Sequence, residues 1–309
     1  MTHRPAILIM QRHLAPLTAF LEATYTVYRF WEGPPVEARD DIRAMIVAGE
    51  YPIDKHLIES LPNLELLACF TSGYDGIDID WCRARGLPVT HAPGVNHEDV
   101  ADHAVGLILA ARRQIVAGDR QLRTGGWVAD TRTITPSLKG QRVGIVGLGL
   151  IGQAVARRLV SLRMPIQWWG PRDKPADWPR ASSLLELARD SDVLVVACKA
   201  DDSNRGLISR EIIDALGPDG LLVNVARGQL VDETAMIEAL HTGRLGQAAL
   251  DVFEQEPTDA ARWANVPNTV LTPHTAGATT EGVQGMLMLL LQNLQASFAE
   301  EPLKSPVPD

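Results

Sequence analysis

Cysteine is scarce in this sequence of 309 residues, which contains only Cys69, Cys82 and Cys198. The three cysteines lie far apart, so no two of them have the spacing of a metal site or a redox motif. Cys69 and Cys198 lie in apolar, strand-like runs, which is typical of cysteines that pack in a protein core. This usage of cysteine favours a reducing compartment, and we expect the cytoplasm.

Long apolar runs and basic runs are also missing. No segment approaches the roughly 18 apolar residues that a membrane-spanning helix needs, and the N-terminal segment lacks the apolar stretch of a signal peptide. Acidic residues outnumber basic ones by 38 to 29, giving a formal net charge of −9, which disfavours nucleic acid as a partner. The lack of long apolar runs leads us to expect no membrane contact. No grouping of His, Cys or carboxylate residues has convincing metal-ligand spacing, so we also expect no metal.

The sequence instead contains apolar, strand-like runs that alternate with helical patterns. The strand-like runs are Ala6–Met10, Ala44–Ala48, Leu64–Phe70, Arg142–Val146, Ile166–Trp169, Val193–Cys198, Leu221–Val225 and Thr269–Leu271. Helical patterns between them include Gln153–Leu162, Leu184–Arg189 and Thr234–Leu240. This alternation predicts an α/β fold with parallel sheets and crossover helices, and the length allows two domains.

Two longer helical patterns join the two halves of the chain. The first begins near Asn96, a reasonable N-cap, and the second runs over Thr280–Phe298. On the first helix His103 lies beside apolar residues, and we expect it to be packed or hydrogen-bonded. The segment Thr124–Lys139 reads as an extended arm. Two interpretations of this arm stay open, contact with another subunit and simple packing on the protein surface.

A glycine-rich motif follows the fourth of these strand-like runs. Arg142–Val146 leads directly into Gly147-Leu-Gly149-Leu-Ile-Gly152, and a helical pattern comes behind it. Gly147 permits a tight turn, Gly149 lets the backbone approach a pyrophosphate, and Gly152 lets helix and strand pack closely. The helix N-terminus adds free N–H groups and a positive dipole end. The motif therefore predicts a dinucleotide site, and the alternative is a structural glycine turn in another α/β protein.

The next strand indicates which dinucleotide binds. An NAD site has an Asp or Glu about 20 residues after the glycines, at the end of this strand. Here the strand Ile166–Trp169 is followed by Gly-Pro-Arg172, and no carboxylate lies at its end. Arg172 can form charge-assisted bonds to a 2′-phosphate, and Asp173, next in the chain, weighs against this reading. We predict NADPH as the preferred cofactor, with NADH possible.

Arg227, Glu256 and His274 each follow an apolar run in the second half of the chain. In open parallel sheets, sites form beyond the carboxyl ends of the strands, so we expect the three side chains to converge. Arg227 can grip the carboxylate and carbonyl of a 2-keto acid, while His274 exchanges a proton with the carbonyl oxygen. Glu256 can fix the tautomer of His274 and favour its charged form. Taken singly, each residue could equally belong to a cap, a loop or a turn.

With these motifs the sequence resembles the D-isomer-specific 2-hydroxyacid dehydrogenase family. The matching stretches are Val143–Gly152, Ser191–Cys198, Leu222–Gly228, Ala249–Pro257 and Leu271–Gly277. The resemblance implies an α/β fold of two Rossmann-like domains with a cleft that closes on the substrate. A flavodoxin-like substrate domain would comprise residues 1–96 and 281–309, and a doubly wound dinucleotide-binding domain would comprise 97–280. It also implies a homodimer built on the cofactor domains.

The resemblance assigns roles to further residues. Backbone groups at Ser72 and Gly73 would hold the substrate carboxylate, Asp251 would bond the nicotinamide amide, and Val100 would line the nicotinamide pocket. Further cofactor contacts would come from Leu150, Ile151, Cys198, Val225, Ala226 and Gly277. In one departure, the segment 199–204 reads Lys-Ala-Asp-Asp-Ser-Asn, where the family usually has Pro-Leu-Thr-Pro-Glu-Thr.

Within the family the chain looks most like the NADPH-dependent glyoxylate/hydroxypyruvate reductases. We therefore expect reduction of glyoxylate and hydroxypyruvate to D-2-hydroxy acids, with Arg227, Glu256 and His274 as the catalytic residues. Two alternatives stay open. One is an NAD-linked D-2-hydroxyacid dehydrogenase of another pathway, and the other is a nucleotide-sensing, corepressor-like protein on the same fold.

Overall fold

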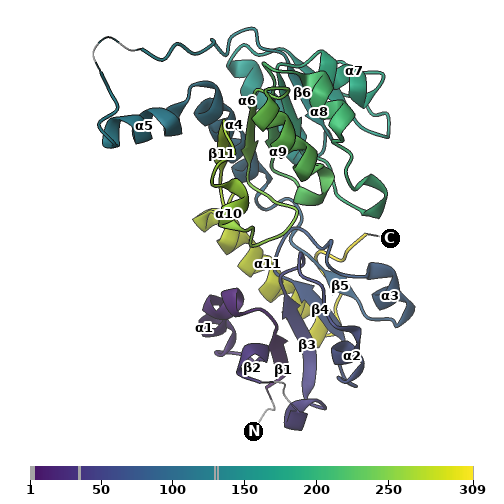
Figure 1. Ribbon diagram of the computed structural model, residues 1–309. Helices are drawn as coiled ribbons and strands as arrows, with labels where there is room; N and C mark the ends of the chain where they lie inside the picture. The colour runs from purple at the N-terminus through teal and green to yellow at the C-terminus, as the bar shows by residue number, and fades with distance from the viewer. Residues whose placement is uncertain (1–3, 34–35, 129, 131, 309) are drawn as a thin grey trace. The chain divides into compact units, whose positions relative to one another are not determined.

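The computed structural model describes residues 4–33, 36–128, 130 and 132–308. The chain divides into two compact units, Met1–Asn96 with Thr280–Asp309, and His97–Thr279. Each unit has a parallel sheet flanked by helices (Figure 1), which confirms the predicted α/β fold. Among the described residues, no helix has the length and apolar character needed to cross a membrane.

The first unit contains a five-stranded parallel sheet in the order β2-β1-β3-β4-β5, the flavodoxin-like order. Its strands are β1 (Ala6–Ile9), β2 (Thr26–Arg29), β3 (Ile42–Val47), β4 (Leu66–Cys69) and β5 (Val89–Thr90). Its helices are η1 (Arg12–Leu17), α1 (Thr18–Leu21), η2 (Phe30–Glu32), η3 (Val36–Ala38), α2 (Lys55–Glu59), α3 (Ile79–Ala84) and α11 (Thr280–Phe298). Strands β1, β3 and β4 are apolar almost throughout because helices cover both faces of the sheet.

The second unit contains a six-stranded parallel sheet in the order β11-β10-β9-β8-β6-β7. Its strands are β6 (Val143–Val146), β7 (Ile166–Trp169), β8 (Val193–Val196), β9 (Leu221–Asn224), β10 (Gln247–Leu250) and β11 (Thr269–Leu271). Its helices are α4 (His97–Arg112), α5 (Ile115–Arg123), α6 (Leu150–Ser161), α7 (Leu184–Arg189), η4 (Asp202–Asn204), α8 (Arg210–Leu216), η5 (Gly228–Leu230), α9 (Glu233–Thr242) and α10 (Ala260–Trp263). The strand order reverses between β6 and β8, and ligands bind at such a reversal in doubly wound sheets.

Two apolar cores cover the faces of this six-stranded sheet. One core joins α4 and α6 to the sheet through residues such as Ile108, Val155 and Ile145. The other joins α7, α8 and α9 through residues such as Leu187 and Met236. The sheet is therefore held rigidly on both sides, and the loops at its carboxyl edge are free to carry a site.

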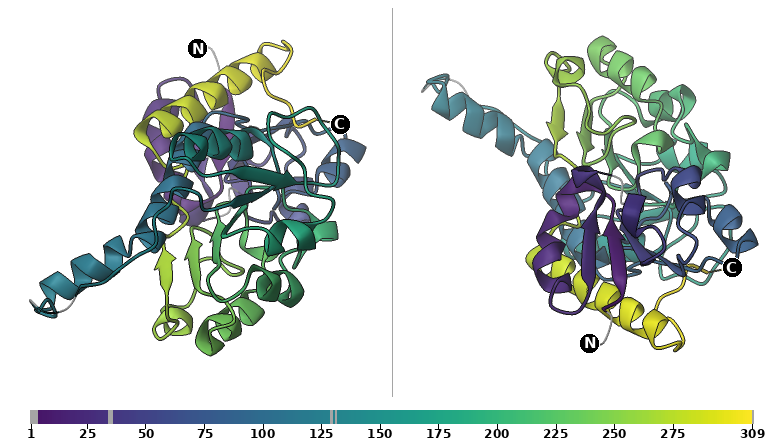
Figure 2. Two further views of the ribbon diagram at one scale, coloured as in Figure 1. Left: turned by 90° about the horizontal axis from the view of Figure 1, so that it is seen from above. Right: turned by 90° about the horizontal axis from the view of Figure 1, so that it is seen from below.

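A segment of the second unit extends away from its sheet. Helix α5 and the chain that follows it project outward in both views of Figure 2. The predicted arm, Thr124–Lys139, has no helix or strand among its described residues, and Ala129 and Thr131 lie outside the described residues. Helix α5 itself was not predicted. Helix α5 together with residues 124–139 is called the arm.

Candidate active site

Three neighbouring strands of the second unit end at the same edge of its sheet. Strand β9 leads to Arg227, β10 to the loop with Glu256, and β11 to His274. The strands are parallel and pair in register, so their carboxyl ends and the loops behind them lie together. The arrangement places three polar side chains of different chemistry on one rigid edge.

His274 and Glu256 form a direct hydrogen bond. Nδ1 of His274 lies 2.6 Å from Oε2 of Glu256, and Oε1 of the same carboxylate accepts the backbone N–H of Phe253 at 2.9 Å. An ionised carboxylate only accepts hydrogen bonds, so Nδ1 carries a proton and the ring presents Nε2 to its surroundings. The pair has the geometry of an oriented acid–base group.

The surroundings of this pair shift both pKa values. Burial acts to lower the pKa of His274, but the hydrogen bond and charge of Glu256 outweigh it and raise that pKa above its ordinary value. Burial acts to raise the pKa of Glu256, but the hydrogen bond and charge of His274, the Phe253 N–H and the charge of Arg227 together outweigh it, so the pKa is lowered. The two side chains therefore favour a charged pair.

Arg227 lies on a loop that Asn224 holds. The Asn224 side chain donates to the Arg227 carbonyl at 2.9 Å and accepts the Ala226 N–H at 3.0 Å. The next residue, Gly228, packs so closely that a Cβ there would lie 1.8 Å from the carbonyl carbon of Phe253. This contact joins the Arg227 loop to the loop that carries Glu256. Asn224 was not among the predicted site residues, although a polar side chain at a strand end, three residues before Arg227, could have indicated its role.

A buried carboxylate supports the Glu256 loop. Glu233, the first residue of α9, is 5% exposed. Its Oε2 accepts the backbone N–H of Glu254 at 3.1 Å, and its Oε1 accepts Nε of Arg262 at 2.5 Å. Glu233 and Arg262 were not predicted as part of the site, because they become neighbours only through the tertiary fold.

The glycine-rich turn has the shape that a pyrophosphate needs. Gly147 adopts a φ of +92°, and a Cβ there would lie 2.5 Å from Cα of Cys198. A Cβ at Gly152 would lie 2.1 Å from the carbonyl oxygen of Gly147, so α6 packs tightly on the turn. A Cβ at Gly149 would meet nothing within 4 Å, and the helix begins there without a side-chain cap. Open space in front of uncapped helical N–H groups fits an anionic ligand.

The other residues expected at the cofactor site lie on several elements of the second unit. Leu150 and Ile151 open α6, Val100 is buried on α4, Cys198 follows β8, Val225 and Ala226 follow β9, and Gly277 follows the His274 loop. Asp251, directly after β10, is 1% exposed.

Basic residues follow the end of β7. Arg172 is exposed, and the Lys174 ammonium donates to the carbonyl of Leu148 within the glycine-rich turn. Burial and the nearby charge of Arg172 lower the pKa of Lys174. Asp173, which weighed against a phosphate site, has an oxygen 3.9 Å from Nη1 of Arg180. Positive charge therefore lies close to the turn.

Ser72 and Gly73 lie in the first unit, in the loop after β4. The Ser72 hydroxyl donates to the carbonyl of Ala92 at 2.6 Å, and Nδ1 of His91 lies 2.9 Å from the Ser72 carbonyl oxygen. A Cβ at Gly49 would lie 2.1 Å from the Gly73 carbonyl oxygen. The loop is thus fixed by neighbours on both sides.

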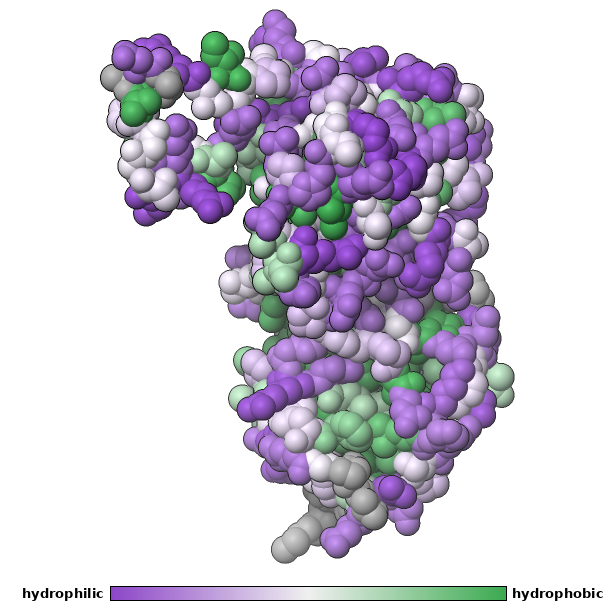
Figure 3. All heavy atoms as spheres, in the orientation of Figure 1, coloured by the Kyte–Doolittle hydropathy of each residue, from purple (hydrophilic) through white to green (hydrophobic). Residues whose placement is uncertain are grey.

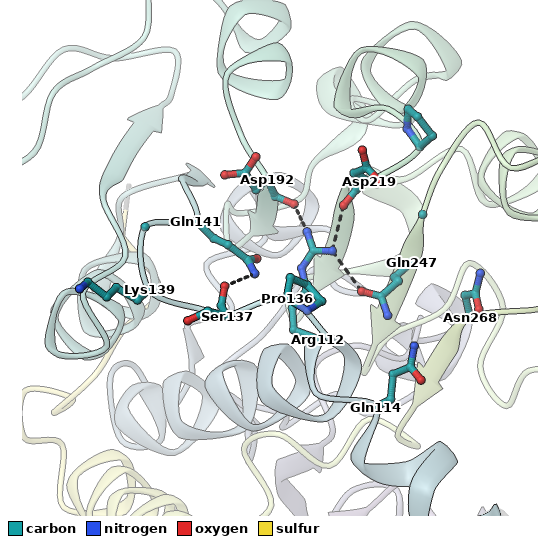
Figure 4. A pocket seen from close by; sticks show the side chains of 13 residues that line it. Arg112, Gln114, Pro136, Ser137, Lys139, Gln141, Asp192, Asp219, Gln247 and Asn268 are labelled. Atoms are coloured by element: carbon teal, nitrogen blue, oxygen red, sulfur yellow. Dashed lines mark hydrogen bonds between the residues drawn. The ribbon is translucent and has the colours of Figure 1, made fainter. Parts of the chain in front are cut away.

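A cavity of about 600 Å³, lined largely by residues with polar side chains, lies at the opposite, amino-terminal edge of the second unit's sheet (Figure 4). The buried side chain of Arg112 donates there to the backbone carbonyls of Asp192 and Asp219 and to the Gln247 side chain. This arginine ties together the starts of three strands. In the part of the chain that the structure describes, no group of three His, Cys, Asp or Glu residues could hold a metal ion.

A family model and several known proteins match the chain. The model of the D-isomer specific 2-hydroxyacid dehydrogenase NAD-binding domain matches residues 105–276, more than half of the chain. A glyoxylate/hydroxypyruvate reductase A of Arabidopsis thaliana is 40% identical over 304 residues, covering 95% of this chain and 97% of the relative.

Two solved structures resemble the chain over nearly its whole length. A 2-hydroxyacid dehydrogenase from Ketogulonicigenium vulgare Y25 has a TM-score of 0.92 and 40% identity, covering 99% of both chains. An NADPH-dependent glyoxylate/hydroxypyruvate reductase from Sinorhizobium meliloti, solved with NADP and malonate, has a TM-score of 0.91 and 34% identity. That alignment covers 98% of this chain and 97% of the other. The chain therefore belongs to the D-isomer-specific 2-hydroxyacid dehydrogenases, a family of nicotinamide-dependent oxidoreductases, and its close relatives include glyoxylate/hydroxypyruvate reductases.

Proposed function

We propose that this chain reduces small 2-keto acids, glyoxylate and hydroxypyruvate foremost, to D-2-hydroxy acids with NADPH. The observation that carries the proposal is the 2.6 Å contact between His274 Nδ1 and Glu256 Oε2, at the sheet edge where Arg227 also lies. The names of two similar proteins, both glyoxylate/hydroxypyruvate reductases, support this choice of substrate.

Arg227 binds and orients the substrate. Its planar guanidinium offers a fork of donors that matches the carboxylate and the adjacent carbonyl of a 2-keto acid. Holding both groups fixes which face of C2 is open to attack, and such orientation lowers the barrier by removing rotational freedom. The hydrogen bonds of Asn224 and the close packing of Gly228 support this role, because they fix the backbone from which the guanidinium extends.

His274 is the proton donor. Reduced nicotinamide supplies the hydride that C2 of the substrate receives. Nε2 of His274 gives its proton to the carbonyl oxygen as negative charge develops there, so the product is the neutral hydroxyl. Glu256 faces the opposite nitrogen and stabilises the imidazolium before transfer. In the oxidative direction the same neutral imidazole takes the proton back.

The glycine-rich turn and the strand ends around it hold the cofactor. Gly147 and Gly149 let the backbone approach the pyrophosphate at the start of α6, Gly152 lets α6 pack on the turn, and Arg172 with Lys174 binds the 2′-phosphate. Further contacts come from Val100, Leu150, Ile151, Cys198, Val225, Ala226, Asp251 and Gly277. Among the described residues, Oδ2 of Asp251 accepts a hydrogen bond only from Ala276. A carboxylate oxygen can accept two, which supports a bond to the nicotinamide amide.

We assign the substrate domain to the first unit and the cofactor domain to the second. Backbone groups of Ser72 and Gly73 hold the substrate carboxylate from the first unit. Contacts with Ala92, His91 and Gly49 hold Ser72 and Gly73 in place, which supports this assignment. Three free cysteines support a reducing, cytoplasmic setting.

The proposal includes a homodimer formed through the arm. Ile115, Val116 and Leu122 on α5 are each more than half exposed, as are Trp127 and Ile134 beyond it. Figure 3 shows hydrophobic side chains on the arm's surface among hydrophilic ones. A second copy of this chain supplies a matching apolar surface, since a twofold interface is self-complementary.

Two substitutions test the catalytic assignment. Arg227→Ala should lower kcat/KM for glyoxylate by about 10²-fold or more while cofactor binding is kept, because the charged grip on the carboxylate is lost. His274→Ala should lower kcat by roughly 10²–10⁴-fold through loss of the proton donor. Steady-state kinetics measure both, and cofactor fluorescence titration measures binding. Near-normal turnover in both variants would overturn the assignment.

A further inference from the structure

Asp251 holds the His274 loop from inside the protein. Its Oδ1 accepts the backbone N–H of Thr275 and its Oδ2 that of Ala276, each at 2.9 Å. Its backbone carbonyl accepts the N–H of His274 at 2.8 Å. His274 has a φ of +52°, a conformation that a residue with a side chain keeps only where its surroundings determine it strongly. Asp251 supplies those surroundings.

His103 on α4 joins this group through Thr272. The Thr272 hydroxyl lies 2.6 Å from Oδ1 of Asp251, and Nε2 of His103 lies 2.9 Å from the same hydroxyl. A hydroxyl has one proton, and the ionised carboxylate must receive it. Nε2 of His103 is therefore the donor to Thr272. The hydrogen bonds run in one direction, from His103 to Thr272 to Asp251.

His103 also lies close enough to act on the charge of Asp251. Its Nε2 is 3.5 Å from Oδ1, and the His103 side chain is 25% exposed against 1% for Asp251. Over the described ranges of the chain, no other basic group lies within ion-pair distance of this carboxylate. A buried carboxylate needs hydrogen-bond donors, and the imidazole N–H of His103 orients the nearest of them, the Thr272 hydroxyl, from α4.

The position of His103 is itself rigid. Its neighbours on α4, Val100, Ala104 and Leu107, are buried, and the helix packs on β10 and β11. These are the strands that lead to Asp251 and to the His274 loop. A donor on this helix therefore fixes the loop relative to the sheet, and does so from outside the three loops that carry the proposed catalytic groups.

We propose that His103 is a positioning residue for His274, which acts by fixing Thr272 and Asp251 and through them the backbone of residues 274–276. The proposal deepens the function given above and rests on it only for the role of His274. It predicts that the donor at Nε2, rather than the aromatic ring, is what the site needs. A glutamine can place a side-chain amide near the position of Nε2, whereas leucine fills the space without a donor.

Amide hydrogen exchange tests the proposal without substrate or turnover. In His103→Leu the amides of Thr275 and Ala276 should exchange at least about tenfold faster, and in His103→Gln they should exchange nearly as in the parent protein. His56→Leu is the matched control, since its side chain is 92% exposed, and should change neither rate. Unchanged exchange in His103→Leu, or equal increases in the leucine and glutamine variants, would overturn the proposal.

Kinetics separate positioning from general destabilisation. His103→Leu should lower kcat by about tenfold with little change in the KM of the keto acid, and His103→Gln should restore most of it. Thr272→Val breaks the same connection, so the double variant should be no slower than Thr272→Val alone. Additive losses would contradict the connection through Thr272. If the parent protein reduces no 2-keto acid, the proposed function fails, while the exchange rates still decide the role of His103.

Discussion

At the scale of single residues, His274 and Glu256 titrate as a pair. The folded-state pKa of His274 is raised, so its contribution to stability is full below the unfolded-state pKa and is lost as the pH rises through the folded one. The pKa of Glu256 is lowered, so its contribution is present above the unfolded-state value and is lost as the pH falls through the folded one. The pair is therefore most stabilising in mildly acidic solution, between the ordinary pKa of a glutamate, 4.5, and that of a histidine, 6.5.

The same pair sets the pH dependence of reduction. Reduction needs a protonated His274, so kcat/KM should fall as the pH rises through the raised pKa, and oxidation should show the opposite trend. Glu256→Gln removes the carboxylate, so the apparent pKa of reduction should move down and kcat should fall by roughly 10²-fold. The pH profile of kcat/KM measures this. Glu254→Gln, two residues away and exposed, is the control and should keep the parent profile; an unmoved pKa in Glu256→Gln contradicts the pairing.

At the scale of elements, two glycines of the glycine-rich turn have different roles, one in the packing of α6 and one in cofactor binding. A methyl group at Gly149 meets open space, whereas one at Gly152 meets the Gly147 carbonyl. Gly149→Ala should therefore keep the melting temperature within a few degrees but weaken cofactor binding at least about tenfold, because the pyrophosphate can no longer approach the backbone. Gly152→Ala should lower the melting temperature as well, because α6 must shift. Calorimetry and cofactor titration measure the two effects, and a Gly149→Ala protein that binds cofactor normally contradicts the assignment of the turn.

The elements that the sequence predicts well are those with a strong local pattern. Ile166–Trp169 and Thr269–Leu271 are strands over the predicted residues, and α11 spans the predicted Thr280–Phe298. Strand β5 has only two residues and β2 is partly exposed, so neither has a recognisable period. Helix α5 has no buried residue, so no apolar stripe facing its own unit marks it as a helix.

The residues of the candidate site likewise divide into those with a local sequence pattern and those without one. Arg227, Glu256 and His274 could be proposed from the sequence because each follows an apolar run and has chemistry suited to the reaction. The residues that hold them could not. Two hydrogen bonds join segments far apart in the chain: the Glu254 N–H donates to the Glu233 carboxylate, and His103 bonds to the Thr272 hydroxyl. Their roles depend on how helices lie against strands, which no local pattern records.

At the scale of the whole molecule, the exposed apolar side chains of the arm allow the proposed homodimer to be tested. Burying one large apolar side chain contributes about 1.5–3 kcal/mol. Ile115 and Leu122 are 55% and 58% exposed, and replacing both with aspartate should raise the dissociation constant of the proposed dimer by at least about 10²-fold. Light scattering after size-exclusion chromatography should give the mass of two chains for the parent protein and of one for the variant. Phe20→Asp, at an exposed site in the first unit, is the control, and a parent protein that is monomeric at micromolar concentration contradicts the dimer.

The central claim concerns the reaction, and steady-state reduction of glyoxylate and hydroxypyruvate with both reduced cofactors tests it most directly. Both keto acids should turn over with NADPH, and kcat/KM should be roughly 10- to 150-fold higher with NADPH than with NADH, because charge-assisted bonds to the 2′-phosphate are each worth about 1.5–3 kcal/mol. A clear preference for NADH would contradict the cofactor assignment. Tight NADPH binding without reduction of any 2-keto acid would contradict the reductase and indicate a nucleotide sensor.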